Sequence, residues 1–436
     1  MMGNQPVIAV FKGQKGYSRL FTAGLINGIG DRFTSVAVLA LVLQLTGSGM
    51  AVGISLGVRL LPYLFLAPLG GILGSKLPRK YIMIAADMLR VPVALAFLWV
   101  DGEDKLWLLY TASFLLAAGE AIYSPVRKSS IPLLVTKDSL LTVNGLEQLM
   151  SGCVLILGAL SGGVVSMWFG PEAAFVMNAV SFLIAAILIY GIDFPQNVNR
   201  VNEDRVKAGK SQEPGQMRAL WIIISGSITL QVIFGYELLV PMLNGLDNVL
   251  ISVYAVQEFQ AGDMGVGFFY AALGIGLSLS FFAGRYVTKG LLSVAIGGLM
   301  IEGLLLMSIS ISNHFAIAFI LYILLSFAGG TGNACLDTLI MREAPSTMQP
   351  IVFGLLSAVG NTLLGLSMLL AGWLLEWVEP RALGFAGGAG FSGIAILLAG
   401  YALIHSKKRG LWHSKHKSLE RPYKDDKCLS EKNKKV

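Results

Sequence analysis

Charged residues are scarce in this chain of 436 residues, since Asp, Glu, Lys and Arg together make up only 14% of it. Soluble proteins carry about 25% charged residues, because polar side chains must cover their surface. Apolar residues make up 55% of the chain, and the mean hydropathy is +0.69. The sequence therefore excludes an ordinary water-soluble protein and predicts an integral membrane protein that lies largely in lipid.

Motifs of enzymes and metal sites are also missing. The sequence has no Walker phosphate-binding loop, no HExxH and no paired CxxC. Its three cysteines predict no disulfide framework, and His413 and His416 in the tail have no thiolate or carboxylate partner at metal-ligand spacing. The net charge of +7 is spread over loops and a tail rather than along one face. We therefore expect no enzyme activity, no cofactor or metal, and no nucleic-acid partner.

Long apolar runs dominate the rest of the sequence. A hydrocarbon core about 30 Å thick needs roughly 20 apolar residues of helix to cross it. Twelve segments meet this requirement, at residues 19–45, 51–74, 81–100, 106–127, 142–168, 172–192, 219–243, 264–285, 290–311, 314–336, 351–377 and 382–404. The seventh is the least regular, because polar residues follow it at 244–248 and apolar residues then resume. The helix either breaks there or continues.

Lys and Arg residues gather in alternate loops. One side of the membrane receives nearly all of them, including the whole tail from Lys407, whereas the opposite loops hold only Lys105 and Arg381. Positively charged loops stay in the cytoplasm, so we predict that both chain ends are cytoplasmic. The first apolar run contains Asp31 and Arg32 and has no cleavage site, so we interpret it as a spanning helix rather than a signal peptide.

A polar linker divides the spans into two sets of six. We expect a cytoplasmic N-terminus at 1–18, one six-helix half at 19–192, the linker at 193–217, a second half at 218–404, and a basic cytoplasmic tail at 405–436. Such a division is typical of transporters that bind substrate between two halves. The tail should be disordered and lie near the anionic inner leaflet. We expect a monomer in the lipid bilayer.

The loop between the second and third spans carries a recognisable motif. Residues 70–80 read Gly-Gly-Ile-Leu-Gly-Ser-Lys-Leu-Pro-Arg-Lys. This segment resembles the signature loop of the major facilitator superfamily, in which glycines allow close helix packing and basic residues bind helix C-termini and carboxylates. The resemblance implies an all-α membrane fold of twelve helices in two six-helix halves. It also implies gating roles for Gly71, Ser75, Lys76, Arg79 and Lys80, and for Asp87 and Arg90 on the next helix. Ser75 stands where the family motif has aspartate.

Further motifs are similar to the proton-coupled drug exporters of that superfamily, which include macrolide and enterobactin exporters. They are Gly30-Asp31, residues 59–62, residues 123–127, Asn144-Gly145 and residues 178–182. An antiporter-type glycine motif follows on the fifth span, with Gly158, Gly162 and Gly163, although Ala159 replaces its proline. The resemblance implies a multi-pass protein of a bacterial plasma membrane that exports drugs in exchange for protons.

Charges inside the spans are costly and are therefore functional candidates. Asp31 lies about 18 Å into the membrane and Arg59 about 24 Å from the same face, at a helical rise of 1.5 Å per residue. We predict that the two side chains pair, and that this carboxylate can exchange its proton when the pair is disturbed. The alternative is a static ion pair that fixes the first helix to the second.

Two further acids of the first half are predicted to pair with arginines. Glu120 and Glu147 both fall near the inner side, and their natural partners are Arg90 and Arg127. The resemblance places the helix of Glu120 at the cavity, which makes it a candidate for proton or cation recognition, and Glu147 a candidate for the cytoplasmic gate. The alternative for both is a structural salt-bridge network.

In the second half, Glu237 is the best candidate, because the resemblance places its helix at the cavity. Asp337 is predicted to pair with Arg342 as an anchor at the inner end, whereas Glu302 has no obvious partner. These features favour a secondary active transporter, with proton-coupled efflux of an amphipathic small molecule as the leading hypothesis. The alternatives are a dedicated transporter of one metabolite, such as a siderophore or lysolipid, and a transport-dead membrane sensor or partner.

Overall fold

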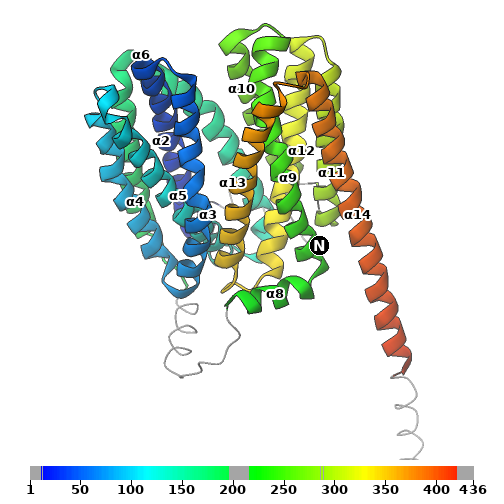
Figure 1. The fold of residues 1–436 in the computed structure, drawn as a ribbon. Coiled ribbons are helices and arrows are strands. Elements are labelled where there is room, and N and C mark those ends of the chain that lie inside the picture. The colour runs from blue at the N-terminus through cyan, green and yellow to red at the C-terminus, as the bar shows by residue number, and fades with distance from the viewer. Residues whose placement is uncertain (1–10, 12, 196–215, 285, 288, 420–436) are drawn as a thin grey trace, which may run out of the picture.

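A computed structural model describes the chain outside residues 1–10, 12, 196–215, 285, 288 and 420–436. The described residues form long helices, of which 12 are long and apolar enough to cross a membrane. Figure 1 shows these helices as two bundles that lie side by side. The predicted all-helical fold with twelve spans is therefore confirmed. Most of the predicted linker and the end of the predicted tail lie outside the described residues.

The first bundle holds six spans. It contains α2 (Lys15–Thr46), α3 (Gly49–Lys76), α4 (Arg79–Ala96), α5 (Leu106–Leu134) and α6 (Leu140–Tyr190), with short 3₁₀ turns η1 (Phe97–Trp99), η2 (Glu103–Lys105) and η3 (Lys137–Ser139) between them. Helix α6 contains two spans, because Gly170 interrupts it with φ 81° and ψ 164°. This backbone conformation carries little strain only for glycine.

The second bundle holds the other six spans. It contains α9 (Ile228–Val253) with the π turn η4 (Tyr254–Glu258), α10 (Gly262–Ala283), α11 (Leu291–Ile311), α12 (Phe315–Glu343), α13 (Gln349–Leu374) and α14 (Pro380–Leu419). A short helix, α8 (Gln216–Gly226), precedes it and lies across the end of this bundle (Figure 1). We call this end of the molecule the linker end, and the other the opposite end.

The seventh span differs from its predicted boundaries, 219–243. Its first part is the separate helix α8, and α9 begins only after Ser227, whose hydroxyl caps the helix by accepting a hydrogen bond from the Leu230 amide at 3.3 Å. The polar residues 244–248 do not break α9, because Asn248 bonds to the Asn244 carbonyl at 2.8 Å and Asp247 is buried. The span therefore runs from Ile228 to Glu258.

Helix α14 is longer than predicted. The spanning part ends at His405, but the helix continues to Leu419 and extends past the linker end in Figure 1. This stretch contains no proline, and its Lys and Arg residues favour helix. The predicted disorder of the tail is therefore wrong for residues up to Leu419.

The apolar core is shared between the halves at the linker end. One cluster of buried side chains joins Val126 and Leu146 of the first half to Ile340 and Ile351 of the second. A small cluster also joins Ala67 and Ala121 to Ala358 of the second half, whereas the other two each stay within one half, around Phe97 in the first bundle and around residues 250–272 in the second. The halves are thus closed against each other at the linker end and have separate cores toward the opposite end.

The backbones of the two halves approach closely where α3 meets α13. A Cβ atom at Gly71 would lie 2.5 Å from the Pro350 carbonyl oxygen, and one at Gly354 would lie 2.5 Å from that of Ala67. A second close approach joins Gly152 of α6 to Gly274 of α10. Small residues at helix crossings permit this packing in membranes. The closed linker end therefore depends on glycine at these positions.

Candidate substrate and proton site

Arg90 of α4 lies at the centre of three carboxylates. Its Nη2 is 2.6 Å from Oδ1 of Asp87, and its Nη1 is 2.9 Å from Oε2 of Glu120 and 3.6 Å from Oδ2 of Asp31. We call these four residues the Arg90 cluster. The Arg90 side chain is only 1% exposed, and a Cβ at Gly119 would lie 2.7 Å from its Cδ. Glycine before Glu120 therefore makes room for the buried arginine.

Two rings and two amides complete the surroundings of the Arg90 cluster. The guanidinium carbon lies 5.0 Å from the centroid of the Tyr123 ring and 4.5 Å from that of Phe182, so both rings favour the cation. Asn27 donates a hydrogen bond to Asp87 at 3.0 Å, and Asn178 donates one to Asp31 at 3.4 Å. Helices α2, α4, α5 and α6 thus converge on one charged group.

The three carboxylates of the Arg90 cluster differ in how far the protein covers them. Asp87 is fully buried and accepts hydrogen bonds from both Asn27 and Arg90. The side chains of Asp31 and Glu120 are 26% and 33% exposed. Asp31 and Glu120 are therefore the two acids of the Arg90 cluster that are only partly covered by the protein.

The predicted pair between Asp31 and Arg59 is not formed. Arg59 instead donates a hydrogen bond to the Ser35 hydroxyl at 2.7 Å, and within the described part of the chain it has no ion pair. Asp31 pairs with Arg90, which reaches it from a third helix. The rise along two helices predicts depth, but it does not predict which neighbouring helix presents the partner.

The predicted pairing of Arg127 with Glu147 is confirmed, as is that of Arg90 with Glu120. The Arg127 guanidinium binds both oxygens of Glu147, at 2.6 and 3.2 Å, and Tyr17 donates to the same carboxylate at 3.1 Å. All of these residues belong to the first half. The Glu147 pair therefore joins helices within one half rather than bridging the two halves.

The contacts between the halves at the linker end use other side chains. Lys128 of α5 lies 3.2 Å from Asp337 of α12, and Asn144 of α6 donates to the Thr338 hydroxyl at 2.9 Å. The predicted pair between Asp337 and Arg342 is not formed, because Arg342 is exposed and Asp337 turns toward the other half. We did not predict from the sequence that Lys128 pairs with an acid of the other half, although Lys128 directly follows Arg127 at the end of the motif at 123–127.

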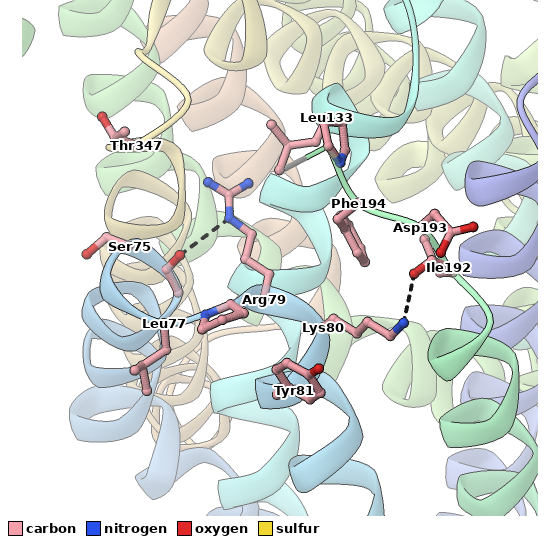
Figure 2. A pocket seen from close by; sticks show the side chains of 13 residues that line it. Ser75, Leu77, Arg79, Lys80, Tyr81, Leu133, Ile192, Asp193, Phe194 and Thr347 are labelled. Atoms are coloured by element: carbon pink, nitrogen blue, oxygen red, sulfur yellow. Dashed lines mark hydrogen bonds between the residues drawn. The ribbon is translucent and has the colours of Figure 1, made fainter. Parts of the chain in front are cut away.

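The signature loop also contributes to this closure. Arg79 is buried and donates hydrogen bonds to the carbonyl groups of Gly74, at 3.4 Å, of Ser129, and of Ser346 in the second half, at 2.5 Å. Lys80 donates to the Ile192 carbonyl at 3.0 Å, and its Nζ lies 5.0 Å from the Tyr190 ring centroid. Figure 2 shows Arg79 and Lys80 in the wall of a cavity of about 540 Å³ at this end.

Ser75 and Lys76 end helix α3 beside this cavity. The Ser75 hydroxyl donates to the Ile72 carbonyl at 2.7 Å, and Ser75 lines the cavity together with Arg79 and Lys80 (Figure 2). Lys76 is exposed. The position that carries an aspartate in the family motif therefore lies near two basic side chains.

The glycine motif of the fifth span lies in α6. A Cβ atom at Gly158 would lie 2.6 Å from the Cβ of Arg32, so this glycine allows α6 to pack on α2. Gly162 and Gly163 also lie in α6, and their surroundings fall outside the described part of the structure.

The second half holds carboxylates that form no ion pair among the described residues. Glu237 of α9 is half-buried and faces Gly360 of α13. Glu302 is 7% exposed and its Oε1 lies against Gly329 of α12, while Asp247 is 9% exposed and its Oδ1 has no hydrogen-bond partner. The described residues hold no group of His, Cys, Asp and Glu that could bind a metal ion.

Comparisons with known proteins identify the family. Residues 20–362 match the family model of the Major Facilitator Superfamily. The chain is 22% identical over 382 residues to the uncharacterized MFS-type transporter YfiS of Bacillus subtilis, which covers 85% of this chain and 89% of that protein. Over 180 residues it is 26% identical to macrolide efflux protein A of Streptococcus pyogenes, which covers 40% of this chain and 44% of that protein.

A solved structure supports the same fold. A bacterial homologue of the iron transporter ferroportin, in an outward-facing state, matches with a TM-score of 0.67 at 17% identity, covering 88% of this chain and 98% of that chain. At this identity the similarity concerns the fold alone. Together with the family match over most of its length, the twelve spans identify this chain as a member of the Major Facilitator Superfamily, a family of membrane transporters rather than enzymes.

Proposed function

We propose that this transporter couples proton movement to the export of amphipathic small molecules, with its linker end in the cytoplasm of a bacterial cell. The distribution of Lys and Arg among the loops supports this orientation. The motifs similar to drug exporters support export, as does the partial match to a protein described as a macrolide efflux protein. Substrate would bind between the two halves.

The Arg90 cluster is the observation that carries the proposal. One guanidinium offsets the charge of one carboxylate, yet three carboxylates lie within 4 Å of it. A proton on Asp31 or Glu120 lowers the excess of negative charge in a site surrounded by lipid and protein. Because these two acids come from α2 and α5, a movement of either helix changes how they share Arg90. Proton binding and helix movement are thereby linked.

The contacts at the linker end define what has to change during transport. In this structure the halves are joined there by Lys128 with Asp337, by Asn144 with Thr338, and by Arg79 with the Ser346 carbonyl. Opening toward the linker end requires all three contacts to break, while the separate cores of the opposite end come together. Alternation between these arrangements moves the central site from one side of the membrane to the other.

Transport by inside-out vesicles tests the proposal. A pH gradient, acid inside, should drive uptake of at least one member of a panel of amphipathic fluorophores with positive, zero or negative charge. Asp31→Asn and Glu120→Gln should each abolish uphill uptake but preserve downhill movement. Asp101→Asn is the matched control, because Asp101 is exposed and pairs only with Lys105, 2.6 Å away. Failure to move any member, or normal uphill uptake by both variants, would contradict the proposal.

A further inference from the structure

Two arginines lie in the middle of the first half but outside the Arg90 cluster. Arg32 follows Asp31 on α2, yet its Cβ lies near Gly158 of α6, on another side of the helix from Arg90. The Arg32 side chain is exposed and, among the described residues, it makes no hydrogen bond or ion pair. Within the part of the chain that the structure describes, Arg59 forms one hydrogen bond, to the Ser35 hydroxyl. A charge at this depth requires a partner or a water-filled space.

These two arginines face the space between the halves. Ser35, which accepts the hydrogen bond from Arg59 of α3, lies three residues after Arg32 on α2, so Arg59 approaches α2 on the face that carries Arg32. Helix α6, on which Arg32 packs, meets α10 at Gly152 and Gly274. Arg32 and Arg59 thus lie where both halves contribute, toward the end at which the cores are separate.

Neither arginine has its charge offset by a close carboxylate. Asp31 precedes Arg32 on α2, but its carboxylate and that of Glu120 lie within 4 Å of Arg90, and among the described residues neither Arg32 nor Arg59 forms an ion pair. Two like charges on neighbouring helices repel each other, and an anion between them removes that repulsion. Guanidinium groups bind carboxylate, sulfate and phosphate oxygens through paired N–H donors, which gives both affinity and geometry.

We infer that the transported molecule is an amphiphile with an anionic group, and that Arg32 and Arg59 bind this group together. The inference rests on the proposed function for the idea of a transported amphiphile, and it adds the sign of the substrate's charge. The apolar part of the substrate would then lie against the helices that line the space between the halves.

Binding to the intact protein in phosphatidylcholine nanodiscs tests this inference. The probe is 11-(dansylamino)undecanoic acid, and its methyl ester is the neutral counterpart with the same apolar chain. The wild type should bind the acid about tenfold more tightly than the ester, the effect of one charge-assisted contact. Arg32→Gln and Arg59→Gln should each remove most of that preference and leave ester binding unchanged. Arg32→Lys should retain part of it, and Lys105→Gln is the matched control because Lys105 is at the opposite end.

The outcomes separate this inference from the proposed function. Equal affinity for acid and ester, absence of binding by both, or an equal loss of both in Arg32→Gln and Arg59→Gln would overturn the assignment of an anion site. Each variant is first checked for a single size-exclusion peak, and either arginine variant alone decides the test if the other does not fold. The binding titration uses no pH gradient, so its result does not depend on whether Asp31→Asn loses proton coupling. Equal binding of acid and ester would in turn contradict only the anion site and not the proposed proton coupling.

Discussion

Each half consists of six spans, but the halves differ in whether the carboxylates within those spans form ion pairs. In the first half, Arg90 binds Asp31, Asp87 and Glu120, and a second arginine binds Glu147. In the second half, half-buried Glu237 and buried Asp247 and Glu302 form no ion pair among the described residues, and the ion pair of Arg381 with Glu258 lies at the opposite end. Ion pairs within the spans are therefore concentrated in the first half.

The second half is held together mainly by close helix packing. A Cβ at Gly303 of α11 would lie 2.5 Å from the Gly388 carbonyl of α14, and one at Gly298 would lie 2.9 Å from the Ala328 carbonyl of α12. Such contacts between small residues stabilise helix association without any charge. The comparison suggests that the first half carries proton and substrate recognition, while the second supplies a packed surface against which it moves.

The largest effect is expected when the first half loses the arginine of its central cluster. Arg90→Gln leaves Asp31, Asp87 and Glu120 without a close cation, and breaking a buried ion pair costs about 3–5 kcal/mol. We expect a strongly lowered thermal unfolding midpoint in detergent and no uphill transport. Adding Glu120→Gln and Asp31→Asn to Arg90→Gln should recover part of the lost stability but no proton coupling. A thermal unfolding midpoint that Arg90→Gln leaves unchanged would contradict the view that the first half, unlike the second, depends on ion pairs.

A smaller effect is expected where the halves meet. Gly71→Ala places a methyl group against the Pro350 carbonyl, and overpacking of this kind costs on the order of 1–3 kcal/mol. This should disfavour the closed linker end and raise the labelling rate of a cysteine introduced at Thr338, which is buried where the halves meet, by roughly tenfold. Gly360→Ala is the matched control, because its Cβ would lie 3.8 Å from Glu237 and Pro241, an ordinary contact. Equal labelling in the two variants would show that this contact does not hold the linker end closed.

The smallest effect is expected in the second half. Glu302→Gln keeps the shape of the side chain and changes a carboxyl group that forms no ion pair among the described residues, so the change in stability should stay below about 1 kcal/mol. Glu147→Gln in the first half is the matched variant, since it takes the carboxylate from Arg127 and should lower the unfolding midpoint clearly more. If both variants lower the midpoint equally, the second half depends on its buried acids as much as the first.

Much of this description could be predicted from the sequence because it depends on quantities read along one helix. Span length against membrane thickness predicted twelve crossings, and the positions of Glu120 and Glu147 near Arg90 and Arg127 predicted two of the ion pairs. The predicted start of the seventh span was wrong. A new helix begins after Ser227, which caps it, and this break lies within a continuous apolar run that gives no sign of it.

The sequence by itself determined that this protein lies in a lipid bilayer, that its spans are helices and that few charged residues lie within them. These properties follow from composition and from the length of apolar runs. Only the tertiary structure decided that Asp31 pairs with Arg90 rather than Arg59, and that Asp337 pairs with Lys128 rather than Arg342. The physical reason is that depth follows from the rise along a helix, whereas partners depend on how each helix is rotated and which helix lies beside it. Those two properties are set by packing of the whole bundle, through contacts such as that of Gly119 with Arg90.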